Sequence, residues 1–471
     1  MTRVRVLAPA LVDFREPLGA FRYARSESQA FWTALEDWAP AFLQARGPDP
    51  TLAAPAVSAG LKSPRGRFNR YDDIRVDTLE RPVEALELLL EPGHVDVALP
   101  ACVDPGAPLA ISCRLYDHSI CLVEVEAGLR SPTDSSPQGV EQHLATVQQA
   151  MVAWGEELAR ELHRRFLSPL VAEARRRDRD EAGVEERSQE VEDGDGSDFG
   201  EVLWVTRSLL VDAADPVASL LQEAWVGAGG VAGATAGQLA PDPTGRAHLI
   251  RWLNYLFVFP PGTMGGVDTV EGTFGDEWRA LRLSQYFYAA LENIDVQLDR
   301  VLARSLAPFA LATVKDLKGE LEGCSRRAEF IVMQLRTTTK YVTRPVRTEL
   351  EGILEYWDFE QVVEEPVQMK VQACERRLRE LSERRSARSA IFTDVILLGI
   401  GVTSILGTTL ALTEFGRTMS VDPGMAGYDT GRNAVIRWIA AQPADLLLFA
   451  AAGVSLVLSV VYLYFRRNNS S

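Results

Sequence analysis

The sequence predicts an α/β domain that is followed by a long helical stalk and a C-terminal two-helix transmembrane hairpin. Apolar runs alternate with amphipathic stretches in the first part of the chain, and the pattern becomes helical from residue 276 onward. Two runs without a charged side chain, 395–413 and 446–465, then close the chain. A helix of about 20 residues, rising about 1.5 Å per residue, crosses the roughly 30 Å hydrocarbon core of a bilayer. Such a helix also satisfies its own backbone hydrogen bonds.

These patterns divide the chain into five predicted regions. They are an N-terminal α/β region (1–177), an acidic disordered loop (178–201), a second α/β region (202–308), a helical stalk (309–389) and the transmembrane hairpin (390–467) with an external connector (414–445).

The 471 residues carry a net charge of -16, which argues against nucleic acid as a partner. The N-terminus has no apolar signal core, so we expect the front part to stay in the cytosol. The five cysteines show no CxxC spacing and are expected to be reduced. The five histidines are scattered, and HExxH, GxSxG and GxxxxGK[ST] are absent, so the sequence predicts neither an enzyme nor a bound cofactor.

In the first region, apolar alternation predicts a strand over Arg3–Leu11. Apolar residues at spacings of three and four predict a helix over Ser26–Ala45. A hairpin is predicted over Leu109–Ala127, where two apolar runs flank a polar turn. Val140–Arg177 is expected to be one long helix.

The second region is predicted to hold a strand over Val202–Asp212, a helix through Trp225 and a further strand over His248–Phe259. A glycine-rich stretch at 227–233 superficially matches a dinucleotide-binding loop, but such a loop must follow a strand. Because this stretch follows a helix, we expect a flexible turn.

In the stalk, prolines separate predicted helices at 309–342 and 346–363, and a last helix begins near Pro366 and runs into the first span. Its apolar residues step by four and three, as in a helix that packs on other helices. Both an ordinary bundle helix and a symmetric coiled coil fit the seam Val367, Val371, Cys374, Leu378 and Leu381.

Arginines predict the orientation of the hairpin. Six lie between 376 and 388 and two follow the second span, whereas the connector has three. Positive charge stays on the cytoplasmic side, so we expect an inner-membrane protein with membrane lipid as a partner and both termini in the cytoplasm.

The first span carries a polar stripe. Asp394, Gly401, Ser404 and Thr408 fall within about 80° on a helical wheel. The stripe fits either the lining of a pore or close helix packing through small residues. Since two spans cannot enclose a pore, a pore requires a homo-oligomer.

An α/β domain, an unbroken stalk running into the first span, a second span and the basic tail Arg466–Arg467 together resemble the CorA family of divalent-cation channels. The resemblance implies a pentamer in which Asp394, Gly401, Ser404 and Thr408 line the conduction path. The family's Gly-Met-Asn signature is absent, so magnesium selectivity does not carry over and the metal ligands are unknown. Glu414 or Asp422 is a candidate for a replacement carboxylate ring at the external mouth.

Two functions follow as expectations. The first is an oligomeric inner-membrane channel for passive flux of divalent metal ions, with the cation as cargo. The alternative is a membrane-anchored sensor or effector, in which the cytosolic domain binds a ligand or partner and the hairpin anchors it or forms a signal-gated pore.

Overall fold

The structure is a computed structural model, and it describes the following residues: 2–12, 25–49, 51–59, 84–116, 119–182, 200–228, 245–251, 253–264, 269–306, 313–421, 438, 441–443, 445–446, 449–450, 452–453 and 456–457. The chain divides into two compact units, Met1–Glu375 and Arg376–Ser471.

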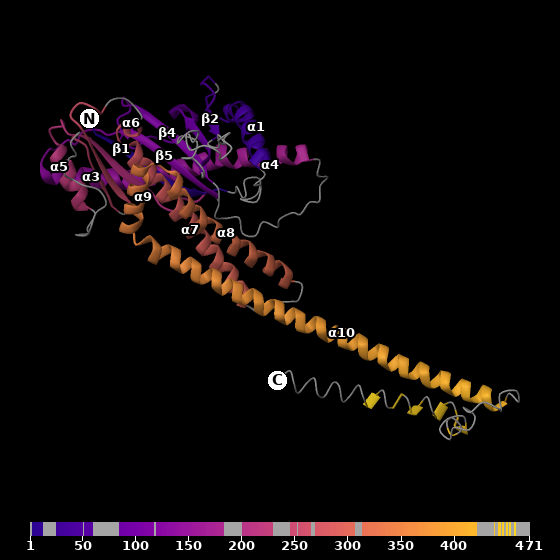
Figure 1. Cartoon of the computed structure of the whole chain (residues 1–471). Coiled ribbons are helices and arrows are strands. Elements are labelled where there is room, and N and C mark those ends of the chain that lie inside the picture. Colours follow the sequence, from indigo (N-terminus) through magenta and orange to yellow (C-terminus); the bar gives the residue numbers. More distant parts are fainter. Residues whose placement is uncertain are drawn as a thin grey trace, which may run out of the picture. The chain divides into compact units, whose positions relative to one another are not determined.

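The first unit is built on an eight-stranded sheet with the order β2-β3-β4-β5-β1-β6-β8-β7 (Figure 1). Neighbouring strands are antiparallel except for β6 and β8, which are parallel because the chain crosses over through α5 between them. The strands are β1 (Thr2–Leu11), β2 (Ala56–Ala59), β3 (Glu84–Leu90), β4 (Leu109–Tyr116), β5 (Ile120–Gly128), β6 (Thr206–Asp212), β7 (Ala247–Ile250) and β8 (Asn254–Phe259).

Helices cover both faces of this sheet, and the last of them continues into the second unit. The α-helices are α1 (Arg25–Gln44), α3 (Pro137–Leu162), α4 (Ser168–Ala182), α5 (Ala218–Ala228), α6 (Thr269–Thr273), α7 (Gly275–Leu306), α8 (Thr313–Tyr341), α9 (Arg344–Tyr356) and α10 (Glu365–Val421). Short helical turns are η2 (Pro92–His94), η4 (His163–Leu167) and η6 (Glu360–Glu364).

One face of the sheet is apolar and packs against α1, α3, α4 and α5. Alternate residues of β1, such as Val4 and Val6, meet Leu144 of α3 in a single buried cluster. Gly155 allows α3 to approach closely, because a Cβ there would lie 3.1 Å from a methyl group of Val6. Burial of this apolar area is the main driving force for forming the unit.

The opposite face carries a buried ion-pair network under α7. The carboxylate of Glu124 on β5 accepts hydrogen bonds from Arg5 at 2.8 Å, Arg114 at 3.1 Å and the indole of Trp278 at 3.1 Å. The guanidinium of Arg5 also lies over the Trp278 ring, 4.4 Å from its centroid. Burial would raise the pKa of Glu124, but Arg114 and Arg5 hold it below the usual value, so the group stays ionised.

Further charges complete this network, which we call the Glu124 network. Arg3 pairs with Glu126 at 3.0 Å, and Arg282 of α7 pairs with Glu271 of α6 at 3.1 Å. With Arg114 and Glu87, which also pair, the network matches four arginines with four glutamates: Arg3, Arg5, Arg114, Arg282, Glu87, Glu124, Glu126 and Glu271.

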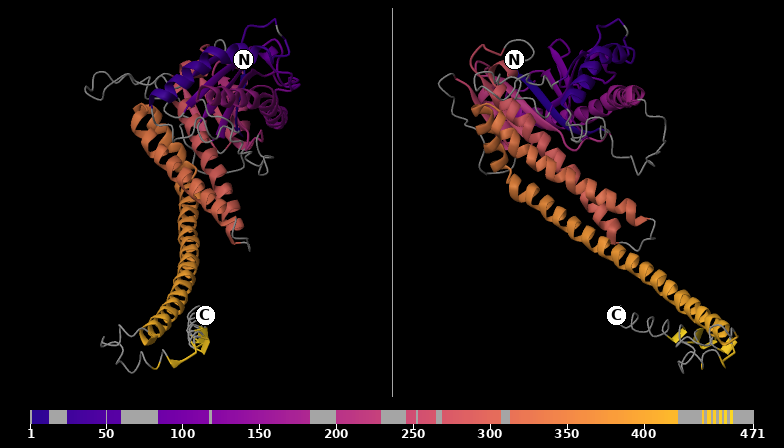
Figure 2. Two further views of the ribbon diagram at one scale, coloured as in Figure 1. Left: turned by 90° about the vertical axis from the view of Figure 1, so that its right-hand side faces the viewer. Right: turned by 45° about the vertical axis from the view of Figure 1, so that its right-hand side comes forward.

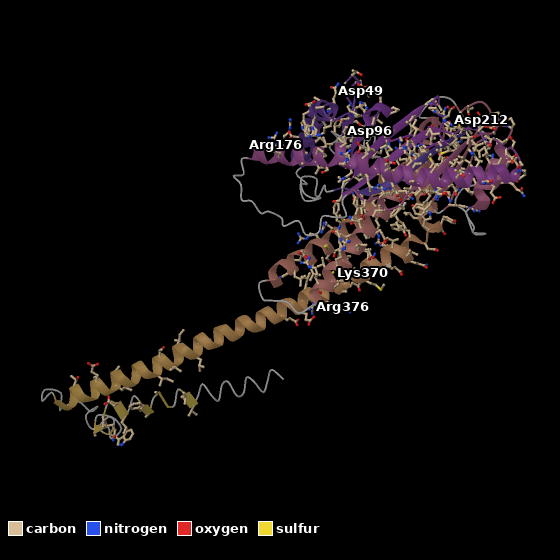
Figure 3. All side chains as sticks on the ribbon, turned by 180° about the vertical axis from the view of Figure 1, so that it is seen from behind. Asp49, Asp96, Arg176, Asp212, Lys370 and Arg376 are labelled. Carbon is tan, nitrogen blue, oxygen red and sulfur yellow. The ribbon has the colours of Figure 1, made fainter. Side chains whose placement is uncertain are left out.

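Helix α7 in turn carries the helices that follow it (Figure 2). The Tyr286 hydroxyl lies 3.3 Å from Gln334 of α8, and Lys370 of α10 pairs with Asp295 at 2.7 Å and Asp299 at 2.6 Å. Figure 3 labels Lys370 on this helical layer. The position of α8 and of the first turns of α10 therefore depends on α7.

The structure confirms the predicted strand at Arg3–Leu11, the hairpin at Leu109–Ala127 and the helical character of the stalk. The predicted strand at His248–Phe259 is two antiparallel strands, because Leu253 takes a left-handed conformation with φ 64° between them. The acidic loop lies largely outside the described residues, and its first residues, 178–182, belong to α4.

The predicted transmembrane hairpin is wrong for the described part of the chain. None of the helices described there is both long enough and apolar enough to cross a membrane. This finding corrects the membrane and ion-transport assignments and the multi-pass inner-membrane localisation. The helix does not end at the predicted membrane edge, since α10 continues past Glu414 to Val421, and the predicted connector therefore begins inside it. Most of 446–465 lies outside the described residues.

Removing one charge from the Glu124 network should destabilise the fold. We expect Glu124→Gln to lower the free energy of unfolding by about 3–5 kcal/mol, because Arg5 and Arg114 would keep buried charges with reduced compensation. Urea unfolding measures the change. The control Glu156→Gln breaks an exposed pair with Arg160, 3.5 Å long, and should change stability by less than about 0.5 kcal/mol. Equal effects of the two variants would contradict a dominant role for the network.

The contact between His248 of β7 and Glu349 of α9, 2.9 Å long, should make stability pH-dependent. Burial alone would lower the pKa of His248, but the hydrogen bond to Glu349 and the charges of Glu349 and Glu277 raise it, against the opposing charge of Arg246. Because the pKa of His248 is raised in the folded state, the contact stabilises the fold fully below the unfolded-state pKa of about 6.5. This stabilisation is lost as pH rises through the folded-state pKa. Thermal unfolding of wild type and Glu349→Gln should therefore differ most in acid, and a difference that grows with pH would contradict this.

Candidate functional site

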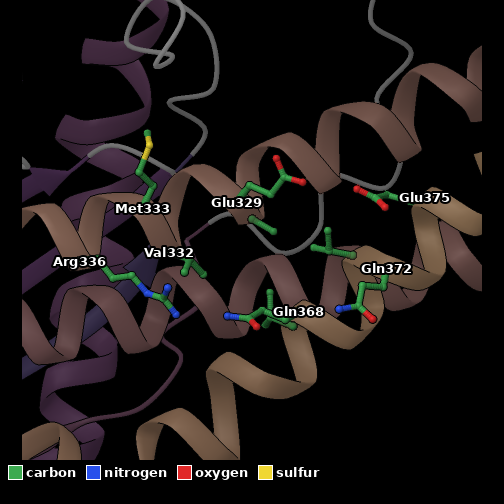
Figure 4. Close-up of a pocket in the computed structure, with 10 residues that line it drawn as sticks. Glu329, Val332, Met333, Arg336, Gln368, Gln372 and Glu375 are labelled. Atoms are coloured by element: carbon green, nitrogen blue, oxygen red, sulfur yellow. The ribbon is translucent and has the colours of Figure 1, made fainter.

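An open groove lies between α8 and the first turns of α10 (Figure 4). Its volume is about 510 Å³, and both helices contribute five lining residues each. Ala328, Val367 and Val371 are buried in its floor, whereas the side chain of Met333 is 55% exposed at the surface. The groove thus offers a largely apolar floor that solvent can reach.

The rim of the groove is polar and differs from end to end. At one end, Arg336 pairs with Glu364 at 2.5 Å, and the amide of Gln368 donates to the same carboxylate at 2.9 Å. Figure 4 places Gln372 and Glu375 toward the other end. An apolar floor between polar edges suits the apolar ridge of a helix better than a small charged substrate, because helix-binding grooves generally have this composition. Methionine adapts its shape readily to such a ridge.

The same stretch of chain also carries an exposed apolar ridge. The side chains of Val362 and Met369 are 56% and 63% exposed, and Pro366 and Ala373 are half-buried between and beyond them. Spacings of three and four residues place Pro366, Met369 and Ala373 along one line of α10, and Val362 precedes them in the π-helical turn η6. On a helical wheel this ridge lies about 120° from the groove residues Gln368 and Gln372, so it faces away from its own groove.

The sequence-predicted site residues lie elsewhere, in the second unit. Gly401, Ser404 and Thr408 are exposed on α10, and the Thr408 hydroxyl donates to the carbonyl oxygen of Ser404 at 2.8 Å. They share a 4-3 line with Leu397, Ala411 and Phe415, which makes the predicted stripe part of a longer face.

The remaining predicted residues fit less well or are not described. Glu414 is exposed on α10, within the helix and not in a loop after it. The backbone of Asp394 belongs to α10 and its side chain lies outside the described part, as does all of Asp422. No cluster of three or more potential metal-ligating side chains occurs among the described residues. A role for the predicted residues in conduction stays a prediction.

The sequence revealed only half of the groove. The 4-3 seam predicts that Val367, Val371 and Cys374 pack against a helix, and all three are buried. The α8 half was missed because Val332 and Met333 are adjacent residues, so the pair adds no periodicity of its own. The one usable signal in the sequence is Met333, an apolar residue that falls off the otherwise regular amphipathic pattern of this helix.

Neither a protein-family model, nor a curated protein, nor a solved structure matches this chain. The resemblance to the CorA family therefore stays a prediction from architecture.

Proposed function

We propose that this chain is a self-assembling sensor or effector, in which the helices join identical copies. The observation that carries the assembly is the pairing of an apolar groove with an exposed apolar ridge on one stretch of the same chain. In the assembly, the ridge around Met369 of one copy enters the groove beside Met333 of the next.

The relation between the two surfaces favours a ring over a simple dimer. Ridge and groove are different surfaces about 120° apart, so each copy can turn its ridge to one neighbour and its groove to another. Such head-to-tail contacts close into rings when the rotation allows it. If copies met instead through two identical patches, the match between the ridge and the groove would have no role. The homo-oligomer expected from the sequence is thus supported by a groove that its own chain can fill.

An exposed apolar face further along α10 also favours a second copy of this chain as the partner. Leu397 is 60% exposed and Phe415 is 47% exposed, with the small residues Gly401 and Ala411 between them on the 4-3 line. Contiguous exposed apolar surface marks an interaction site. A helix face with this period is best matched by a second face of the same period, which a further copy of the chain supplies.

The other function classes have less support. Passive cation flux requires spanning helices of a kind that the described residues do not contain. An enzyme would need a constellation of catalytic side chains, for which the sequence provides no recognisable motif.

The assembly can be tested by measuring the mass of the purified full chain in solution by light scattering. Wild type should have a multiple of the chain's 51.9 kDa. We expect Met369→Glu and Met333→Glu each to shift the population toward the monomer, because either places a charge in the apolar contact. Leu306→Glu is the control: Leu306 is an apolar side chain that is 73% exposed but lies outside both surfaces, so the mass of this variant should stay equal to that of wild type.

Cross-linking tests whether the ridge of one copy meets the groove of another. Mixed Met333→Cys and Met369→Cys proteins should form a disulfide between the two variants, and each variant alone should give far less. Strong cross-linking of one variant with itself would instead indicate a two-fold contact. A monomeric wild type at all concentrations would overturn the assembly and leave the groove to a different protein.

A further inference from the structure

Two cysteines meet inside the apolar face of the sheet. Cys113 of β4 and Cys121 of β5 are both fully buried, and their sulfur atoms lie 3.0 Å apart. That separation is only about 1 Å longer than a covalent disulfide bond. The sequence spacing alone suggests nothing of this kind, because seven residues and a turn separate the pair.

The strand register explains why the sulfur atoms meet. Cys113 lies opposite Val123, and Cys121 lies opposite Leu115, so the cysteines are diagonal neighbours on adjacent antiparallel strands. Both side chains point to the face covered by α3, since residues two apart share a face. Diagonal neighbours on adjacent strands are about 7–8 Å apart, so these two short side chains come within 3.0 Å only because they lean toward one another.

We propose that Cys113 and Cys121 form a disulfide by exchange with a low-molecular-weight disulfide. The thiolate of Cys121 attacks one sulfur of that compound and releases one of its halves as a thiol. The thiolate of Cys113 then attacks the Cys121 sulfur of the mixed disulfide and releases the second half. The protein loses two hydrogen atoms in total, and the small disulfide is reduced to two thiols.

The environment determines when this reaction proceeds. Burial, together with the neighbouring Cys113 thiol, raises the pKa of Cys121, so little thiolate exists in the folded state. Exchange is therefore fastest while the hairpin is formed but not yet covered, during folding or transient opening. Once closed, the bond is shielded from reductants within the buried core and links the two strands that carry Arg114 and Glu124 on their other face.

The test is to refold the urea-denatured full chain with oxidised glutathione and, in parallel, with a reductant. The oxidised protein should be lighter by two hydrogen atoms, should show three titratable thiols in place of five, and should yield a peptide that links Cys113 to Cys121. Its melting temperature should be higher than that of the reduced protein.

Two cysteine variants show whether the bond joins Cys113 to Cys121. Cys113→Ala should form no internal disulfide after the oxidising treatment and can at most keep glutathione as a mixed disulfide on Cys121, whereas the control Cys102→Ser should still yield the peptide that links Cys113 to Cys121. If Cys113→Ala does not refold, mild oxidation of the native wild type in low urea supplies the same linked peptide. Five thiols after every treatment, or a bond between other cysteines, would overturn the proposal. Solution mass in reductant reports the assembly separately, so the two proposals can fail independently.

Discussion

The ionised carboxylate of Glu124 is the constraint on which the first unit depends. It is 1% exposed, and a buried charge is tolerated only when opposite charge and hydrogen bonds surround it. Its partners come from β1, β4 and α7. A shift of any of these elements by one residue would separate a charge from its partner. The network therefore specifies the register of three strands and the position of α7, whereas the apolar face supplies most of the driving force.

Within the first unit, α8 and the first turns of α10 are held in place by α7. Its buried aromatic residues anchor it, as in the stacked rings of Tyr116 and Tyr286, 4.5 Å apart. Its outer side holds α8 through Gln334 and α10 through Lys370. The groove exists because α7 supports both of these helices while neither fills the space between their outer surfaces. The Glu124 network helps to position α7, and α7 supports the two helices that form the groove.

The exposed surfaces have a common physical meaning. Apolar side chains such as Met333 and Met369 lose favourable free energy when left in water, and a chain normally buries them or uses them. Their arrangement as groove and ridge on one stretch lets identical copies satisfy both at once. The disulfide pair serves a different purpose, since it constrains two strands inside one copy and needs no partner.

The sequence by itself determined several elements, because periodicity reports which side of a strand or helix is apolar. β1, the β4–β5 hairpin and the packed seam at Val367 and Val371 all follow from it, whereas β2 and β3 were not predicted. It misjudged the end of the predicted first span, since local apolarity does not say where a helix stops. Tertiary structure alone decided the pairing of Arg5 with Glu124, the meeting of Cys113 with Cys121 and the groove beside Met333. Each of these joins residues from different elements, and no local pattern encodes the register or crossing of elements that brings such residues together.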